Sequence, residues 1–251
     1  MKWLKKFATH AEYEAYMSGS SIAYPNVSVC EDNYEIHMTD VGEVITPHDY
    51  VEIAGIKWAT MNVGATAITD YGLYFQWGDI SGYTAEQIGS GTGQKYFGWA
   101  DYVYGNGTSN PGATGMTKYN STDGKTVLDL SDDGVNANWG GVWRMPTRAE
   151  FVALGNATTS DWTTDYMGSG VKGMIVTDKT DSSKQLFFPA AGYALDGSRY
   201  NVGSGGYYWS SSLYSRNVLN GYSLSFISGA VYWQYSGHRR LGFCLRGILD
   251  E

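Results

Sequence analysis

Apolar residues occur along this chain in short runs separated by glycine, which is the pattern of a protein built mainly from β-strands. Beyond residue 49 these runs predict strands at residues 51–56, 71–77, 186–188, 223–226, 230–233 and 243–248. The 33 glycines and 21 tyrosines beside only 5 prolines agree with many short strands and turns. We therefore do not expect a helical protein.

One helix is predicted inside this strand-rich region. Thr147 and Glu150 have the spacing of a capping box, in which both side chains bond free backbone amides at a helix start. The predicted helix covers residues 148–154, with Phe151 and Leu154 on its buried face and Gly155 as its end. Residues 84–88 are predicted to form a further helical turn.

Residues 1–48 predict a small separate module. Thr9 and Glu12 repeat the capping-box spacing, so a helix is expected over residues 10–18, directly after the basic start of the chain. Alternating residues at 26–30 and 34–38 predict a hairpin, and residues 40–49 contain the expected linker. Because such a module is too small to build a core alone, we expect it to dock on another body. The remaining residues, 49–251, are enough for one large domain.

Residues 89–133 have few periodic apolar positions and many Gly, Ser, Thr and Asn, which predicts long ordered loops. The expected anchors of these loops are the aromatic residues Tyr96, Phe97, Trp99 and Tyr104.

Three acidic residues, Asp129, Asp132 and Asp133, stand before Gly134 and are loosely similar to a calcium loop. Such a loop needs Glu at its twelfth position, and none is present. The group is therefore interpreted as a solvated turn.

The overall charge excludes some classes of partner. The chain has 17 Lys+Arg against 25 Asp+Glu, whereas phosphate binding needs clustered Lys and Arg, so nucleic acid is not expected as a partner. No apolar run approaches the roughly 18 residues of a membrane span, and no signal peptide is apparent. We expect a chain made in the cytoplasm, without membrane insertion. Cys30 and Cys244 are expected to be free, buried thiols.

The segment 198–249 has a composition of its own. It contains no Asp, Glu, Lys or Met, and it is rich in Tyr, Ser, Gly and Asn. Tyrosine offers a large, stiff contact area while Ser, Gly and Asn adapt their hydrogen bonds, which is the composition of antibody contact loops. Two interpretations stay open: a binding surface, or Tyr/Ser-rich edge strands and loops without a ligand.

Several strings resemble the C-type-lectin-fold domains related to formylglycine-generating enzyme, in particular the Fibrobacter-type major paralogous domain. They are IKWATMNVGA (56–65), DYGLYFQWGD (70–79), NWGGVWRMPTRAEF (138–151), LFFPAAGYALDGS (186–198), GYYWSSS (206–212) and GFCLR (242–246). The resemblance implies an α+β C-type lectin fold over residues 49–251, with many short antiparallel strands, two or three short helices and long ordered loops.

Within this fold family the chain is similar to the variable proteins of diversity-generating retroelements, whose C-terminal segment is rewritten by adenine-directed mutation. Such mutation resembles a codon-level filter that yields many residue types but not Lys, Glu or Met. The absence of these three residues from segment 198–249, called the tail below, fits this filter. The resemblance then implies that residues 198–243 are the variable segment and that Trp209, Trp233 and Gln234 are invariant. The resemblance implies a ligand surface made from Tyr207, Leu213, Tyr214, Ser215, Arg216, Asn217, Ser223, Ser225, Tyr232, Tyr235, Ser236, His238, Arg240 and Leu241. Trp209, Phe226, Trp233 and Phe243 are expected to hold this surface rigid from below.

The strings KKFATHAEYEAYM (5–17) and PNVSVCEDNYEIHM (25–38) resemble short docking modules on virion proteins of phages that infect gut bacteria. This resemblance implies a virion location and contacts with other virion proteins through the N-terminal module.

The chemistry of the related enzymes is not expected here. Formylglycine-generating enzymes use a close pair of cysteines with copper, but only Cys244 lies in the corresponding region. No carboxylate occurs between Asp196 and Asp250, so a calcium-dependent sugar site is not expected. We expect no enzyme activity, no cofactor and no metal; an oxidoreductase remnant is the weakest alternative.

These observations predict a non-enzymatic protein that binds a protein or glycan on a bacterial surface through a hypervariable Tyr/Ser-rich face, used for phage attachment to its host. The alternative is a structural tip or decoration protein of the virion whose C-terminal face packs against a sister subunit.

Overall fold

The structure is a computed structural model that describes residues 2–6, 27–30, 35–38 and 48–250, and the chain divides into two compact units, Met1–His48 and Asp49–Glu251. In the first unit, β1 (Lys2–Lys6), β2 (Val27–Cys30) and β3 (Glu35–Met38) form an antiparallel sheet in the order β1-β3-β2. The predicted hairpin is confirmed, with Val27 opposite Met38 and Cys30 opposite Glu35. The predicted helix at 10–18 and most of the linker lie outside the described residues.

Strand β1 was not predicted from the sequence, which was expected to pass from its basic start into a helix. Lys2–Lys6 instead pairs with β3 along the second edge of that strand. Pairing with a neighbouring strand can override the weak strand preference of such a lysine-rich segment.

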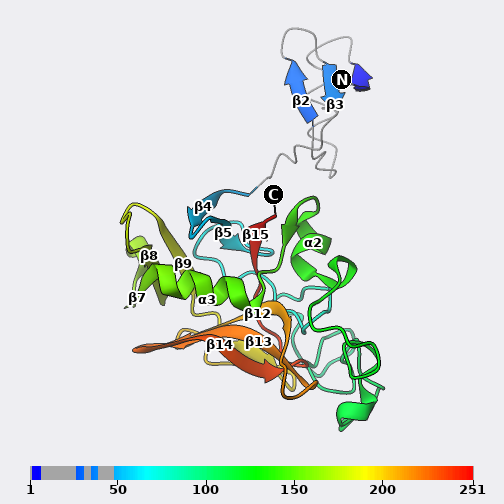
Figure 1. The fold of residues 1–251 in the computed structure, drawn as a ribbon. Coiled ribbons are helices and arrows are strands. Elements are labelled where there is room, and N and C mark those ends of the chain that lie inside the picture. Colours follow the sequence, from blue (N-terminus) through cyan, green and yellow to red (C-terminus); the bar gives the residue numbers. More distant parts are fainter. Residues whose placement is uncertain (1, 7–26, 31–34, 39–47, 251) are drawn as a thin grey trace. The chain divides into compact units, whose positions relative to one another are not determined.

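The second unit is an α+β body of small, mostly antiparallel sheets with few helices and long loops, as predicted (Figure 1). Its sheets have the strand orders β4-β5-β15-β6, β7-β8-β9, β10-β11 and β12-β13-β14. The strands are β4 (Tyr50–Ile53), β5 (Ile56–Asn62), β6 (Trp143–Arg144), β7 (Thr158–Thr163), β8 (Gly173–Asp178), β9 (Gln185–Pro189), β10 (Tyr193–Leu195), β11 (Ser198–Tyr200), β12 (Gly205–Leu213), β13 (Asn220–Ile227), β14 (Ala230–His238) and β15 (Arg246–Leu249). The helices are α2 (Gly134–Trp139) and α3 (Arg148–Ala157), with 3-10 turns η1 (Ala113–Gly115), η2 (Leu130–Asp132) and η3 (Tyr166–Gly168).

The last strand of this unit lies beside its second strand, because β15 pairs with β5. Arg246 of β15 fixes this junction. Its guanidinium is completely buried and donates hydrogen bonds to the carbonyls of Ala59 (2.9 Å), Thr60 (2.7 Å) and Phe187 (2.8 Å). Burial lowers the pKa of Arg246 to about 10. Arg246 is therefore part of the core.

Helix α3 begins at the predicted capping box, because Thr147 Oγ1 accepts from the Glu150 amide and the Glu150 carboxylate accepts from the Thr147 amide. The prediction that Gly155 ends the helix is wrong, since α3 continues to Ala157. Gly155 is instead the point where the Trp233 ring packs on the helix: a Cβ at this position would lie 2.5 Å from Trp233 Nε1.

Three other predicted elements differ from the structure. The strand at 51–56 is split into β4 and β5 because Ala54 (φ 56°) and Gly55 (φ 71°) form a tight turn. Residues 71–77 make only isolated bridges, at Tyr74 and Phe75. The helical turn at 84–88 is a single turn in which the Gln87 amide donates to the carbonyl of Thr84.

The predicted long loops over residues 89–133 are confirmed, with only η1, η2 and isolated bridges inside them. Phe97 and Trp99 are buried as expected, whereas Tyr96 is exposed and does not anchor the loop.

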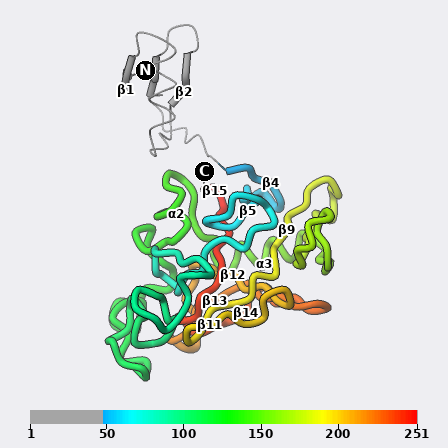
Figure 2. Tube along the Cα trace, turned by 180° about the vertical axis from the view of Figure 1, so that it is seen from behind, coloured from blue at the N-terminus to red at the C-terminus, as the bar shows by residue number. Residues whose placement is uncertain are grey.

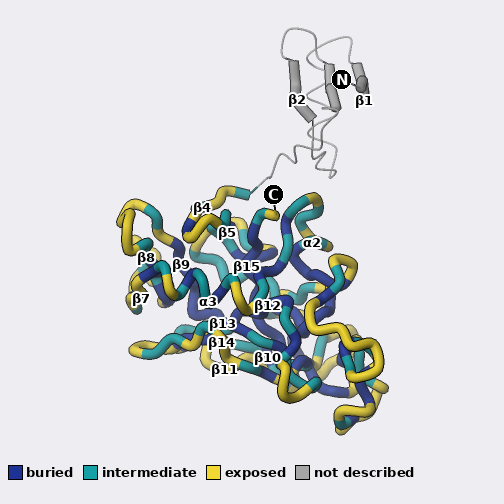
Figure 3. The backbone as a smooth tube through the Cα atoms, viewed as in Figure 1, coloured by how far each residue is buried: buried dark blue, intermediate teal, exposed yellow. Residues whose placement is uncertain are grey.

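The sheet β12-β13-β14 has a buried layer on each face. Because neighbouring residues of a strand point to opposite faces, Tyr208 lies in the layer with Trp58 and Phe226, and Trp209 in the layer with Trp77. Figure 3 shows that β12 and β13 are mostly buried whereas β14 is largely intermediate or exposed, and Figure 2 shows from behind the red C-terminal segment passing along β12. The tail is therefore built into the core along much of its length.

Candidate ligand-binding surface

The strand register sorts the tail residues between the two faces of the β12-β13-β14 sheet. Tyr207 pairs with Ser225, and Ser223 pairs with Tyr235, so these four residues share one face. The opposite face carries Leu224 and other core residues and packs partly against α3. Within this sheet, parts of the first face and the outer edge of β14 are accessible to an outside molecule.

A cavity of about 260 Å³ opens on the first face, and we call it the tyrosine pocket. It is lined by Tyr193, Leu195, Tyr207, Tyr235, His238, Arg240, Leu241 and Phe243. Five of these, Tyr207, Tyr235, His238, Arg240 and Leu241, are predicted contact residues, and β12, β14 and the turn after β14 bring them together.

Aromatic contacts make the pocket wall rigid. The Tyr193 and Tyr207 rings meet edge to face at 5.0 Å, and Tyr207 lies 5.3 Å from Phe243. Phe243 in turn stacks on Trp209 at 4.0 Å, and both of these rings are buried. The Tyr207 hydroxyl accepts a hydrogen bond from Asn201 Nδ2 at 2.9 Å. A ring held on several sides loses little freedom when it binds a ligand.

The charges of the pocket compensate each other within the protein. Arg240 Nη1 donates to Asp196 Oδ1 at 2.7 Å, and its guanidinium lies 5.9 Å from the Trp99 ring centre. Burial and the charge of Arg240 lower the pKa of His238, so this imidazole is neutral at pH 7. The pocket therefore offers aromatic surface and hydrogen-bonding groups without a net charge.

A second cavity, of about 510 Å³, follows β14, and we call it the edge groove. It is lined by Val231, Tyr232, Trp233, Gln234, Tyr235 and Ser236 of β14, by Tyr214, and by Val152 and Asn156 of α3. Tyr232 and Tyr235 are 54% and 43% exposed, and Tyr235 lines both cavities. The predicted residues Tyr214, Tyr232 and Ser236 thus lie beside the tyrosine pocket and not inside it.

The turn between β12 and β13 carries the remaining accessible residues. Ser215, Arg216 and Asn217 are exposed, and Tyr214 is half-buried with its ring 5.0 Å from Tyr222. Ser215 Oγ lies 3.3 Å from the Tyr222 hydroxyl. Tyr214 lines the edge groove, and Ser215, Arg216 and Asn217 extend the surface beyond both cavities.

Leu213, Ser223 and Ser225 must be removed from the predicted contact surface, because their side chains are buried. The serines lie on the central strand, where the larger residues of β12 and β14 cover them on both sides. Leu213 packs into the core at the end of β12. The alternation of a strand predicts the face of the sheet on which a side chain lies. It does not predict that bulky side chains on neighbouring strands bury a small side chain on that face.

The expected supports are buried in three of four cases: Trp209, Phe226 and Phe243 are buried, and Trp233 is half-buried between the sheet and α3. Tyr193 and Leu195 line the tyrosine pocket but were not predicted as contact residues. They lie outside the segment of unusual composition and reach the pocket through an antiparallel bridge between Ala194 and Gly242. No local pattern indicates that long-range pairing.

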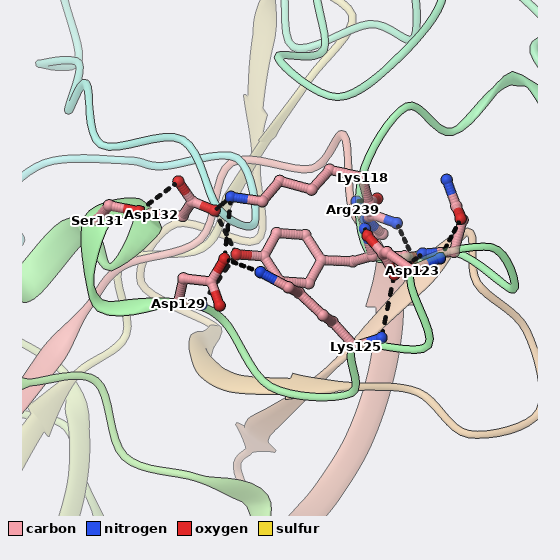
Figure 4. A network of polar contacts seen from close by, with 9 residues as sticks. Lys118, Asp123, Lys125, Asp129, Ser131, Asp132 and Arg239 are labelled. Atoms are coloured by element: carbon pink, nitrogen blue, oxygen red, sulfur yellow. Dashed lines mark hydrogen bonds and ion pairs between the residues drawn. The ribbon is translucent and has the colours of Figure 1, made fainter.

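A polar network under the end of β14 holds the neighbours of Arg239 in place (Figure 4). Arg239 is completely buried and donates to the Tyr102 hydroxyl (2.7 Å), the Val218 carbonyl (2.9 Å) and the Lys118 carbonyl (2.9 Å). Its chain neighbours, His238 and Arg240, line the tyrosine pocket.

The structure corrects the interpretation of the three acidic residues as a solvated turn. Asp132 and Asp133 are buried: Asp132 binds Lys118 and the Tyr119 hydroxyl, and Asp133 caps α2 through the amides of Val135 (2.9 Å) and Asn136 (3.0 Å). Helix α2 was not predicted, although Asp133 before Gly134 is an ordinary helix start.

Within residues 48–250 and the described strands of the first unit, no group of three His, Cys, Asp or Glu side chains is placed to hold a metal ion. Cys244 is a free, buried thiol as predicted, whereas the side chain of Cys30 lies outside the description. Among the described residues no helix is long and apolar enough to cross a membrane.

Comparison with known proteins returned no match to this chain among protein-family models, curated proteins or solved structures.

Proposed function

We propose that this chain is a non-enzymatic binding protein that recognises a molecule on a bacterial surface through the tyrosine pocket, the edge groove and the turn between β12 and β13. The observation that carries the proposal is that five predicted contact residues from β12, β14 and the following turn line one aromatic cavity. Eleven of the fourteen predicted residues are exposed or half-buried, and the other three are the buried residues named above.

The proposed fold is the C-type lectin fold of the formylglycine-generating-enzyme-like branch. Its support is the resemblance of the six sequence strings, together with an α+β body of small antiparallel sheets, short helices and a long loop region. We further propose that a diversity-generating retroelement varies the surface and that the chain belongs to a phage virion. Support for these two proposals comes from the composition of the tail and the resemblances of the sequence.

Binding can be tested with the labelled full-length chain on a panel of gut bacteria. The proposal expects saturable binding to a subset of strains, which unlabelled chain competes away. A library randomised at the eleven accessible positions should yield members with different strain preferences and unchanged thermal unfolding. Binding to no strain, or equal binding by every library member, would contradict the proposal.

The proposed diversification has a separate test in the surrounding DNA. We expect a near-copy of the 3′ coding segment that differs mainly at its adenines, next to a reverse transcriptase reading frame. Without this copy, the binding function remains proposed but the retroelement does not.

A further inference from the structure

One edge of strand β14 is unpaired among the described strands. In the three-stranded order β12-β13-β14, no described strand pairs with β14 on its outer side. Natural proteins usually protect such edges with lysine, proline, short strands or β-bulges. Strand β14 is nine residues long and contains neither Lys nor Pro nor an acidic residue. Its register with β13 shifts between Tyr232 and Tyr235, and it is regular from Tyr235 to His238.

The edge groove follows the backbone of this strand. Residues 231–236 all line it, and the register of β14 with β13 shifts between Tyr232 and Tyr235. Apart from that shift, successive side chains point to opposite faces, so a cavity that touches all six residues reaches the strand edge, where backbone N–H and C=O groups are presented. Val152 and Asn156, one turn apart on α3, form its other wall.

The hydrogen-bond pattern shows which backbone groups face this groove. The Arg239 amide donates to the Leu219 carbonyl at 2.9 Å, so it points toward the β13 side. Because amides alternate in direction along an antiparallel strand, the amides of Ser236 and His238 point away from β13. The His238 carbonyl already accepts from Leu241, so the free part of the edge ends near Ser236.

We propose that this edge binds an extended segment of a partner protein, which adds to the sheet as a fourth strand beside β14. The inference rests on the proposed binding function and names the partner class, protein, for one part of the surface. Main-chain hydrogen bonds would supply affinity, while Tyr232 and Tyr235 on one side and α3 on the other would select side chains.

The test uses a phage-displayed library of linear random peptides, selected on the full-length chain. Selected peptides should lose at least about tenfold in affinity toward Ser236→Pro, which removes an outward amide and leaves the ladder to β13 intact. The matched control is Ser228→Pro in the β13–β14 turn before Gly229 (φ 88°), where proline suits the turn. Methylating alternate backbone amides of a selected peptide should abolish its binding to the unchanged protein, a result that does not depend on folding of the variant.

Equal affinity of the peptides for Ser236→Pro and the unchanged chain, or tolerance of methylation at every amide, would overturn the inference. Failure to select any peptide would also overturn the inference. If the chain instead forms a concentration-dependent dimer that Ser236→Pro abolishes, the edge binds a second copy of this chain and the inference is wrong. If Ser236→Pro still binds bacteria while Tyr207→Ala does not, the proposed function stands and this inference fails.

Discussion

The guanidinium of Arg239 lies 4.8 Å from the ring centre of Trp77, and both side chains are completely buried. A buried arginine is stable only when its donors are satisfied, and here the acceptors are carbonyls and a hydroxyl from segments far apart in the chain. Arg239 therefore fastens the long loop region to the strand end that carries His238 and Arg240. The proposed surface depends on this attachment.

Replacing Arg239 with Met should lower the free energy of unfolding by about 3 kcal/mol or more, because several buried acceptors lose their donors. Urea unfolding measures the change. Arg216→Met, at an exposed position of the β12–β13 turn, is the control and should stay within about 0.5 kcal/mol of the unchanged protein. Equal stability of the two variants would contradict the role given to Arg239.

Asp132 should make the loop region sensitive to acid. Burial acts to raise the pKa of Asp132, but hydrogen bonds from Lys118, Tyr119 and Tyr104 outweigh it and hold the pKa below its usual value. The stabilisation is present above the unfolded pKa of about 3.9 and is lost as pH falls through the lower folded value. Asp132→Asn should cost about 2 kcal/mol at pH 7 and flatten the acid limb of the stability curve. An unchanged acid limb would show that the ionised carboxylate does not stabilise the fold.

Cys244 should be unreactive in the folded protein. Burial raises the pKa of its thiol to about 12, so the folded state holds a proton that the unfolded state releases near pH 8.5. The free energy of unfolding should therefore fall as pH rises from about 8.5 to about 12. This fall should be less steep for Cys244→Ala than for the unchanged protein. In a Cys30→Ser background, iodoacetamide should label Cys244 only after unfolding. Rapid labelling of the native chain would contradict the burial and would favour an oxidoreductase remnant.

Gly155→Ala should destabilise the protein although alanine is the better helix former. The new methyl group would meet the Trp233 ring, and overpacking costs about 1–3 kcal/mol against roughly 1 kcal/mol of helix propensity. Combining Gly155→Ala with Trp233→Phe should recover part of the loss, because the smaller ring leaves room. Chemical denaturation of the two single variants and the pair gives the coupling. Strict additivity would show that the contact does not limit this position.

Local patterns predicted the elements whose cause is local. Thr147 and Glu150 produce the start of α3 by contacts within one turn, and the alternation around residues 26–38 produces a hairpin. The end of α3 could not be predicted, since Gly155 has a tertiary role against Trp233.

The candidate surface was partly predictable for the same reason. Composition singled out the strands that carry Tyr207 and Tyr235, but long-range pairing brings Tyr193 to the same pocket. The burial of Ser223 depends on its neighbours in two other strands. Such contacts depend on how the strands pack against one another, and no periodic pattern in the sequence indicates them.

The most direct measurement is the affinity of the chain for a bound bacterial strain after single replacement of surface tyrosines. Tyr207→Ala and Tyr235→Ala should each weaken binding by at least about tenfold, as expected for aromatic residues at the centre of an interface. Tyr50→Ala, on β4 and 45% exposed, should leave the affinity unchanged. If Tyr207→Ala and Tyr235→Ala bind as tightly as the unchanged chain, the tyrosine pocket is not the recognition surface, whether or not Tyr50→Ala weakens binding.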